Sequence, residues 1–414
     1  MAENVKKYIT SDELKKHNKP DDLWLSVQGK VYNVTEWAKI HPGGATPLLH
    51  LAGQDVTDAF IAFHPGSAWK HLDKFFTGYH LEDFQVSDVS KDYRKLVTQF
   101  AKSGMFEKKG HGVIYSLCFI ALLFYACLYG VLYCNSFWIH MLSAAILGIA
   151  WMQVTYLGHD SGHYEIMMNR GFNKLAQIVT GNCLTGISIA WWKWTHNAHH
   201  ETHIRFHGKV SCELSAFDIL SSDVRCQSQS VCADIIASVL TKEKVPDRAL
   251  NIFGILVFWT WFPLLLSRLP NWNERILFVL ASFCVTSIQH IQFCLNHFAA
   301  NVYVGAPKGN DWFEKQTSGT IDISCSPRMD WFFGGLQFQL EHHLFPRLPR
   351  CHFRNISPLV QDLCKKHNLP YRSLSFLDAN KLTYRTLRTA AMEARDFSSP
   401  VPKNLLWEAV NTHG

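Results

Sequence analysis

Long apolar segments stand out against an otherwise polar chain, and they come in two pairs. The first pair starts at Val113 and Phe137. Each of its members runs for about 20 residues without a charged side chain, which is enough for a helix to cross a hydrocarbon core of about 30 Å. The second pair starts at Asn251 and Ile276, and the short polar stretch SRLPNWNER separates its members. This pattern predicts about four transmembrane helices in two hairpins, although four buried helices of a soluble protein would show similar apolar runs.

The polar segments that flank these runs predict the orientation of the chain in a membrane. The N-terminal stretch MAENVKKYITSDELKKHNKPDDL has no apolar signal-peptide core, so we expect the N-terminus to stay in the cytosol. Four crossings would return the C-terminus to the same side. Basic residues favour that side by the positive-inside rule, namely Lys102, Lys108 and Lys109 before the first run and Arg347, Arg350, Arg354, Lys365 and Lys366 after the last.

Chain length and composition indicate how the chain is divided into domains. At 414 residues the chain is long enough for about two to four domains. We expect a polar N-terminal domain at 6–82, a linker at 83–111, a membrane domain at 112–380 and a cytosolic tail at 381–414. The net charge of +6 suits a surface against anionic lipid, and the 12 cysteines, without paired spacing, are most simply reduced thiols. In the linker, Leu96, Phe100 and Met105 predict an amphipathic helix, either at the membrane interface or on an ordinary protein surface.

Two histidines of the N-terminal domain stand on turns that would suit a flat cofactor. His41 is followed by Pro-Gly-Gly in WAKIHPGG, and His64 by Pro-Gly in FIAFHPG. Glycines such as Gly43 and Gly44 let the backbone approach a ligand closely. Two neutral imidazoles from opposing segments can hold a haem iron from both faces for electron transfer. Taken alone, a histidine before Pro-Gly is weak evidence for a haem ligand and is better explained as an ordinary loop residue.

The surrounding residues make the haem interpretation stronger. The stretch HPGGATPLLHLAGQDVTDAF, with Trp24 and Val34 upstream, resembles cytochrome b5, and the resemblance covers roughly Tyr8 to Leu81. It implies a small α+β domain that binds haem b. It also implies that His41 and His64 are the two axial ligands.

Three further histidine groups lie at the predicted ends of the apolar runs. They are HDSGH, with His159 and His163; HNAHH, with His196, His199 and His200; and QLEHH, with Gln339, His342 and His343. The first pair is spaced i, i+4, which places both side chains on one face of a helix. With two hairpins and a cytosolic N-terminus, all three groups emerge on the cytosolic side.

Seven histidines at one membrane surface indicate metal binding. Imidazole suits iron, copper or zinc. A structural zinc site takes four ligands and is usually closed by cysteine, so seven imidazoles favour two ions. A single group could consist of surface histidines, but three groups on one side argue against that. A zinc hydrolase would not need electrons from a haem, whereas a di-iron centre must be reduced before it activates oxygen. The combination predicts oxidation of an unactivated C–H bond in a lipid chain.

The three groups and the N-terminal domain together resemble the front-end desaturases, in which glutamine opens the third group. The stretches CLNHFAANVYVGAPKGNDWFEKQTSGTIDIS and MDWFFGGLQFQLEHHLFPRLPR are similar to plant delta-8 sphingolipid desaturases more than to delta-6 fatty-acid enzymes. The resemblance implies an all-α integral membrane di-iron domain in the endoplasmic reticulum, facing the cytosol. It further implies O2 as co-substrate, electrons from NADH through cytochrome b5 reductase, and a ceramide or sphingoid base as lipid substrate. We expect no nucleic-acid partner.

Two residues are open to more than one role. Gln339 offers an amide oxygen, a weaker ligand than imidazole, and an NH2 group that can donate a hydrogen bond. It could bind iron weakly, orient a ligand from outside the coordination shell, or only fill space. His297 in LNHF is either an additional iron ligand, as the family resemblance implies, or a buried structural histidine. We expect His290, one heptad earlier, to be structural.

One segment departs from the family. Residues 201–232, ETHIRFHGKVSCELSAFDILSSDVRCQSQSVC, are polar and rich in Cys and Ser, where front-end desaturases carry a longer, largely apolar stretch. A misplaced exon boundary or a frame error in a gene model would produce such a stretch. His203 and His207 continue the i, i+4 row from His199, and we interpret them as accidental. Three alternatives follow: a front-end acyl-lipid or acyl-CoA desaturase, a histidine-box hydroxylase, and a catalytically impaired haem-binding membrane protein.

Overall fold

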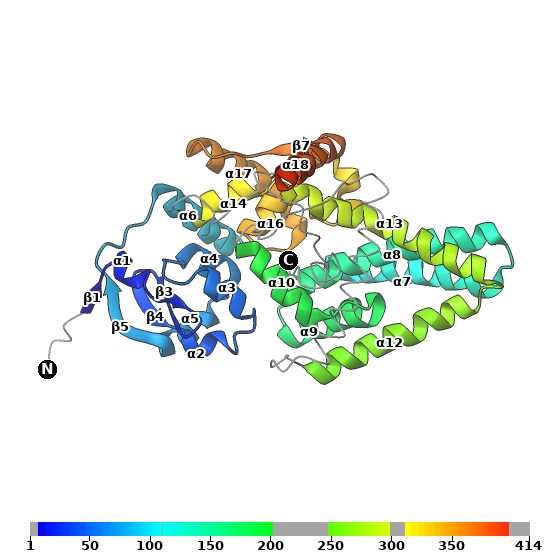
Figure 1. Cartoon of the computed structure of the whole chain (residues 1–414), viewed down its shortest axis with the longest axis horizontal. Helices are drawn as coiled ribbons and strands as arrows, with labels where there is room; N and C mark the ends of the chain where they lie inside the picture. Colours follow the sequence, from blue (N-terminus) through cyan, green and yellow to red (C-terminus); the bar gives the residue numbers. More distant parts are fainter. Residues whose placement is uncertain (1–6, 110, 202–246, 299–310, 397–414) are drawn as a thin grey trace.

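The chain folds into a small domain built around a sheet and a larger helical domain beside it (Figure 1). The computed structural model describes residues 7–109, 111–201, 247–298 and 311–396. The divergent segment therefore lies outside the described residues except for Glu201, and so do His203 and His207.

The small domain is an α+β unit, as predicted. Its five-stranded sheet has the order β1-β5-β4-β3-β2, with β1 parallel to β5 and the other neighbours antiparallel. The strands are β1 (Lys7–Ile9), β2 (Asn18–Lys19), β3 (Asp22–Val27), β4 (Lys30–Asn33) and β5 (Phe76–Leu81). Alternation along β3 buries Leu23, Leu25 and Val27 in the domain core. The short helices around the sheet are α1 (Ser11–Leu14), α2 (Thr35–Ala38), α3 (Ala45–His50), α4 (Thr57–Phe63) and α5 (Ser67–Leu72).

All four predicted apolar runs form helices. They are α7 (His111–Tyr133), α8 (Phe137–Gly162), α12 (Arg248–Ser267) and α13 (Trp272–Phe298), and α8 packs along both α7 and α13. Within the described ranges, three helices are long and apolar enough to cross a membrane: Gly112–Tyr133, Phe137–Gly162 and Arg248–Ser267. Helix α13 is 27 residues long but falls outside that set, and its C-terminal half buries the polar side chains of Gln289, Gln292 and Asn296. The helical domain is thus a membrane domain with several apolar helices.

The remaining elements cover the end of these long helices that faces the small domain. They are α9 (Arg170–Gln177), a π-helix (Ile178–Thr185), α10 (Ile189–Glu201), α14 (Trp312–Gly319), α15 (Asp330–Phe333), α16 (Gln339–Leu344), α17 (Phe353–Lys366) and α18 (Phe376–Asp396). Strands β6 (Asp322–Ser324) and β7 (Ser373–Ser375) pair in parallel. The expected tail boundary at 380 falls inside α18, which packs on α13.

Helix α6 (Asp88–Lys102) connects the two domains and packs against α14 and α17. Its apolar residues Val89, Tyr93 and Phe100 are buried in one core cluster with Phe345 and Phe353. The amphipathic pattern is therefore explained by protein packing: that face is covered by the chain itself and does not lie against lipid.

Candidate haem and metal sites

Five of the predicted histidines converge on one point in the interior. Their ligand nitrogens all lie within 4.8 Å of one another, and all five side chains are buried: His159, His163, His196, His200 and His342. They come from three elements that are distant in sequence, the end of α8, helix α10 and helix α16. The structure thus brings together members of all three groups.

The nitrogens of this cluster face one another closely. His196 Nε2 lies 2.9 Å from His163 Nε2 and 3.0 Å from His200 Nε2. His342 Nε2 lies 3.1 Å from His200 Nε2. His159 Nε2 is buried and has no hydrogen-bond partner among the described residues. Since imidazole nitrogens sit about 2 Å from a bound metal ion, this donor set fits metal ions at its centre.

Electrostatics keep His200 in the form that binds a metal. Burial, together with the neighbouring histidines, lowers the pKa of His200 well below its usual value. A neutral imidazole retains the lone pair that binds a metal. Glu165 is buried beside the cluster, with its Oε1 3.8 Å from His342 Nδ1.

His343 and Gln339 lie at one side of the cluster. The His343 ring is centred 4.3 Å from that of His200, and its Nδ1 donates to Gln316 Oε1 at 2.9 Å. Gln316 Nε2 in turn donates to the His200 carbonyl at 2.9 Å. His343 Nε2 then faces Gln339 Nε2 at 3.1 Å, while Gln339 Oε1 accepts from Asn296 Nδ2 at 3.0 Å. The glutamine therefore points its NH2 group at the nitrogen through which His343 would bind a metal.

Helix α16, which carries these residues, is fixed by a buried acidic group. Asp322 Oδ1 accepts from the Leu340 backbone N–H at 3.0 Å. The Tyr371 hydroxyl lies 2.6 Å from Asp322 Oδ2 and 3.0 Å from Glu341 Oε1. Because Asp322 and Glu341 are both fully enclosed, these contacts set the rotation of α16 and hence the direction of its histidines.

Two predicted ligands remain expectations. Helices α10 and α13 include residues 199 and 297, but the side chains of His199 and His297 lie outside the described residues, as does that of His290.

The two predicted haem ligands face each other in the small domain. The rings of His41 and His64 are centred 6.1 Å apart, which leaves room for one metal ion between them. His41 Nδ1 donates to the Gly44 carbonyl at 2.9 Å, and His64 Nδ1 to the Phe60 carbonyl at 3.3 Å. The Nε2 atom of each ring is then the one available to a metal.

Charge and shape in this site also suit haem. Burial lowers the pKa of His41, and burial together with the nearby His41 ring lowers the pKa of His64 to about 3. Both rings are therefore neutral at physiological pH. Gly44 has φ +87°, which residues with side chains rarely adopt. A Cβ on Gly43 would lie 2.9 Å from His41 Cε1.

Sequence reasoning missed the residues that hold these histidines. These residues are far along the chain from the side chains they contact, so sequence spacing could not identify them. They are Gln316 beside His343, Asn296 beside Gln339 and Glu165 beside His342. Gln316 lies between Lys315 and Thr317 in a polar stretch, so composition gave no signal either.

Two families match the chain in the order of its domains. Residues 10–81 match the "Cytochrome b5-like Heme/Steroid binding domain" and residues 239–375 match "Fatty acid desaturase". A "Delta(8)-fatty-acid desaturase" of Helianthus annuus is 64% identical, over 99% of this chain and 97% of that protein. The chain belongs to the cytochrome b5-containing fatty acid desaturases.

Further relatives agree with this membership. A "Delta(8)-fatty-acid desaturase" of Borago officinalis is 62% identical, and an "Acyl-lipid (9-3)-desaturase" of the same plant is 53% identical, each over the whole of both chains. The prediction of a front-end desaturase, an oxidoreductase, is thereby confirmed. The cytochrome b5 match implies haem, and the desaturase match together with the histidine cluster implies iron.

The relatives also bear on the divergent segment. The alignment with the Borago delta-8 relative runs over 450 positions, against 414 residues in this chain. This desaturase therefore lacks residues that the relative has. The desaturase family match begins at residue 239, just beyond 201–232.

Proposed function

We propose that this desaturase introduces a double bond at the delta-8 position of the long-chain base of sphingolipids. The observation that carries the proposal is the buried convergence of five histidines from α8, α10 and α16, beside a domain of the cytochrome b5 family. The delta-8 position is supported by the names of the delta-8 relatives. The sphingoid substrate is supported by the sequence resemblance to plant delta-8 sphingolipid desaturases.

Each histidine has a proposed role. His41 and His64 are the axial ligands of haem b, with Gly43 and Gly44 giving it space. Two iron ions are held by His159, His163, His196, His199, His200, His342 and His343, with His297 as a further ligand. This number of imidazoles exceeds the four ligands of a closed structural zinc site, which supports two ions. Gln339 acts on the centre by orienting His343.

The residues around the metal centre fix the tautomer of His343 and exclude water, as oxidation of a C–H bond requires. Bound iron, once reduced, supplies the activation of O2 that this chemistry requires. Gln316 keeps the proton of His343 on Nδ1, so that Nε2 carries the lone pair that can bind a metal. Burial of the whole cluster excludes water from it. The chain sets the position of the double bond by holding particular carbons of the lipid near the irons.

The partners and the location follow from the same proposal. Electrons come from NADH through cytochrome b5 reductase to the haem domain. The substrate is a ceramide or sphingoid base within the endoplasmic reticulum membrane. The haem domain and the histidine cluster face the cytosol, in agreement with the basic residues around the apolar runs.

An acyl-lipid desaturase is the second candidate. It is supported by the Borago relative named "Acyl-lipid (9-3)-desaturase", which matches the chain over its whole length. The two candidates share fold and metal site and differ only in the lipid they accept.

Expression in yeast supplied with suitable long-chain bases tests both candidates. We expect delta-8 unsaturated long-chain bases by mass spectrometry once residues 201–232 are replaced by the corresponding stretch of the Helianthus relative, and none when His159→Ala is added to that chain. Unsaturation confined to fatty acyl chains would assign the second candidate, and hydroxylated products would indicate a hydroxylase. Haem without non-haem iron and without product would identify a catalytically impaired protein.

A further inference from the structure

We propose that the Phe63 ring is the route by which electrons pass from the haem site to the iron site, and that Arg347 positions this ring by holding helix α4 against the membrane domain. This inference rests on the haem and iron sites of the proposed function. It adds the surface through which they communicate and the residues that build it.

Phe63 places its ring against the metal cluster from the end of helix α4. It directly precedes His64, and its ring is centred 5.7 Å from the His200 ring, which it meets edge-on at 82°. The Trp312 ring lies 6.4 Å away on the same side. Phe63 is therefore adjacent in the chain to His64, a proposed haem ligand, and in contact with His200 of the metal cluster.

Arg347, which follows the third histidine group, forms hydrogen bonds to the C-terminal end of α4. Its Nε donates to the Ala62 carbonyl at 2.8 Å, and its Nη2 to the Ile61 carbonyl at 3.0 Å. These carbonyls belong to the last turn of α4, where helix carbonyls lack intrahelical partners and the helix dipole is negative. A guanidinium is well suited to such an end. Arg347 follows His343 by four residues, so this contact couples the position of His64 to that of α16.

The loop that carries the other haem ligand is also in contact with the metal cluster. Asn197, in helix α10 between His196 and His200, donates from Nδ2 to the Gly43 carbonyl at 3.3 Å. Both segments that would hold haem therefore touch elements that would hold iron.

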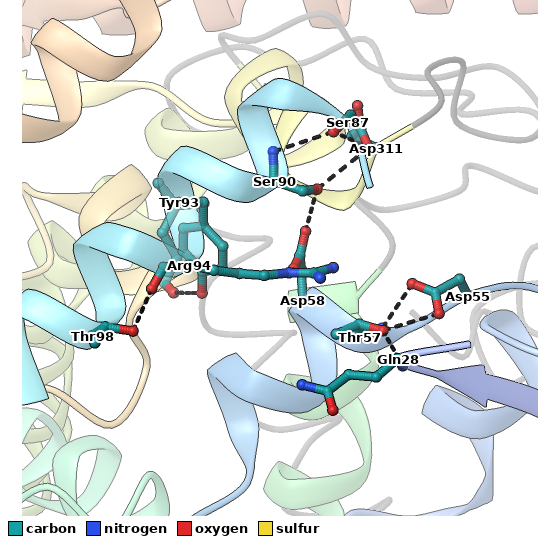
Figure 2. Close-up of polar contacts among 11 residues, drawn as sticks. Gln28, Asp55, Thr57, Asp58, Ser87, Ser90, Tyr93, Arg94, Thr98 and Asp311 are labelled. Carbon is teal, nitrogen blue, oxygen red and sulfur yellow. Dashed lines mark hydrogen bonds and ion pairs between the residues drawn. The ribbon is translucent and has the colours of Figure 1, made fainter. Parts of the chain in front are cut away.

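A polar cluster on α6 completes the docking surface (Figure 2). Asp58 of α4 is buried and accepts from Ser90 Oγ and from Arg94 Nε, each at 2.5 Å. Ser87 Oγ donates to Asp311 Oδ1 at 2.9 Å, just before α14. On the same helix, the Tyr93 hydroxyl donates to the Leu344 carbonyl at 2.7 Å. Helix α6 thus binds both the haem domain and the membrane domain.

Apolar packing makes this arrangement specific to the chain's own haem domain. Ala59 and Ala62 of α4 are buried in one core cluster with Trp312, Phe313 and Leu340 of the membrane domain. A separate cytochrome b5 could reach the same surface only by displacing this packing.

The transfer itself balances simply. In each event the haem iron is oxidised from ferrous to ferric, and one non-haem iron is reduced from ferric to ferrous, with no change in covalent bonds. Two events supply two electrons; with two protons and the two hydrogens removed from the lipid, they reduce one O2 to two waters. The haem is then reduced again by NADH through the flavoprotein reductase.

The test for the route uses the purified full-length protein with haem and iron bound. The haem is reduced, oxygen and lipid substrate are added, and haem reoxidation is followed by absorbance in stopped flow. We expect Phe63→Leu to keep the haem spectrum and iron content but to reoxidise several-fold more slowly. Phe76→Leu is the matched control, because the Phe76 ring lies against Tyr32 and His80 of the same domain. Wild-type reoxidation in Phe63→Leu, with iron and product present, would overturn the route.

The docking is tested without reference to iron. Hydrogen exchange of residues 57–64 should be about tenfold faster in Arg347→Leu, since two hydrogen bonds from a charged donor are lost. Arg328→Leu, at an exposed arginine, should exchange as wild type does. Unchanged exchange in Arg347→Leu would overturn the docking. If the wild type held no non-haem iron and gave no product, the proposed function would fail, and this measurement alone would decide the docking.

Discussion

Gln339 stands where the histidine patterns of the chain would lead one to expect an imidazole. The structure directs its NH2 group at His343 and engages its carbonyl with Asn296. An amide ligand binds a metal through oxygen, and here that oxygen already accepts a hydrogen bond. The geometry favours an orienting role for Gln339 over direct ligation.

We therefore predict that Gln339→Ala loses iron and that Gln339→His retains more of it. A methyl group can neither orient His343 nor accept from Asn296, whereas imidazole can bind iron itself. Loss of a residue that orients a ligand typically lowers metal affinity about 10- to 100-fold. The measurement is non-haem iron per haem after a chelator challenge, with the exposed Gln361→Ala as control. Equal iron in all variants would remove any role of Gln339 at the centre.

The facing pair His41 and His64 gives a second prediction at this scale. Either His41→Ala or His64→Ala should abolish the low-spin haem spectrum, because a haem with two imidazole ligands cannot keep it when one is missing. Membrane insertion should be unaffected. His17→Ala is the control, since that ring stacks on Trp24 instead. An unchanged visible spectrum in either ligand variant would refute the assignment.

At the scale of elements, the crossing of α8 and α13 depends on one small residue. A Cβ on Gly148 would lie 2.6 Å from the Ser282 carbonyl oxygen and 2.7 Å from Val285 Cβ. The two helices can approach this closely only because Gly148 has no side chain. Since α8 carries His159 near its end and the C-terminal half of α13 carries Asn296, the crossing also controls the spacing of the metal site.

Gly148→Ala should therefore destabilise the membrane domain by about 1–3 kcal/mol, as overpacking typically does. The midpoint of thermal unfolding in detergent measures the effect. Gly112→Ala, at a helical glycine where a Cβ would meet nothing within 4 Å, should leave the midpoint unchanged. Equal midpoints for both variants would show that the helices can separate without cost.

The sequence was sufficient for those elements whose pattern is local. Charge-free runs predicted all four long helices, and Pro-Gly turns marked both haem-facing histidines. Prediction from the sequence failed where the contacting residues are far apart along the chain. Nothing near Arg347 indicates that it binds α4, 285 residues away, and nothing near Gln316 indicates His200. The apolar face of α6 could be recognised, but whether lipid or protein covers it depends on the tertiary structure.

At the scale of the whole molecule, the two domains share a core, so the haem site and the metal site depend on the same packing. Residues of α4, α6, α14, α16 and α17 belong to one buried cluster. The divergent segment 201–232 begins at the last residue of α10, directly after His200. Ligands keep their geometry only when the surrounding residues hold them, so a changed sequence at this point acts first on the iron site.

We therefore expect the chain as it stands to insert in the membrane and bind haem, since neither property uses residues 201–232. Non-haem iron should be substoichiometric, and desaturation of sphingoid bases weak or absent. Replacing the segment with the corresponding stretch of the Helianthus relative should restore both, as measured by iron per haem and by lipid analysis in yeast. The same replacement in a His159→Ala background should restore neither, which separates repair of the segment from a general gain in expression. Abundant delta-8 product from the unmodified chain would refute a defect and make this sequence a working enzyme.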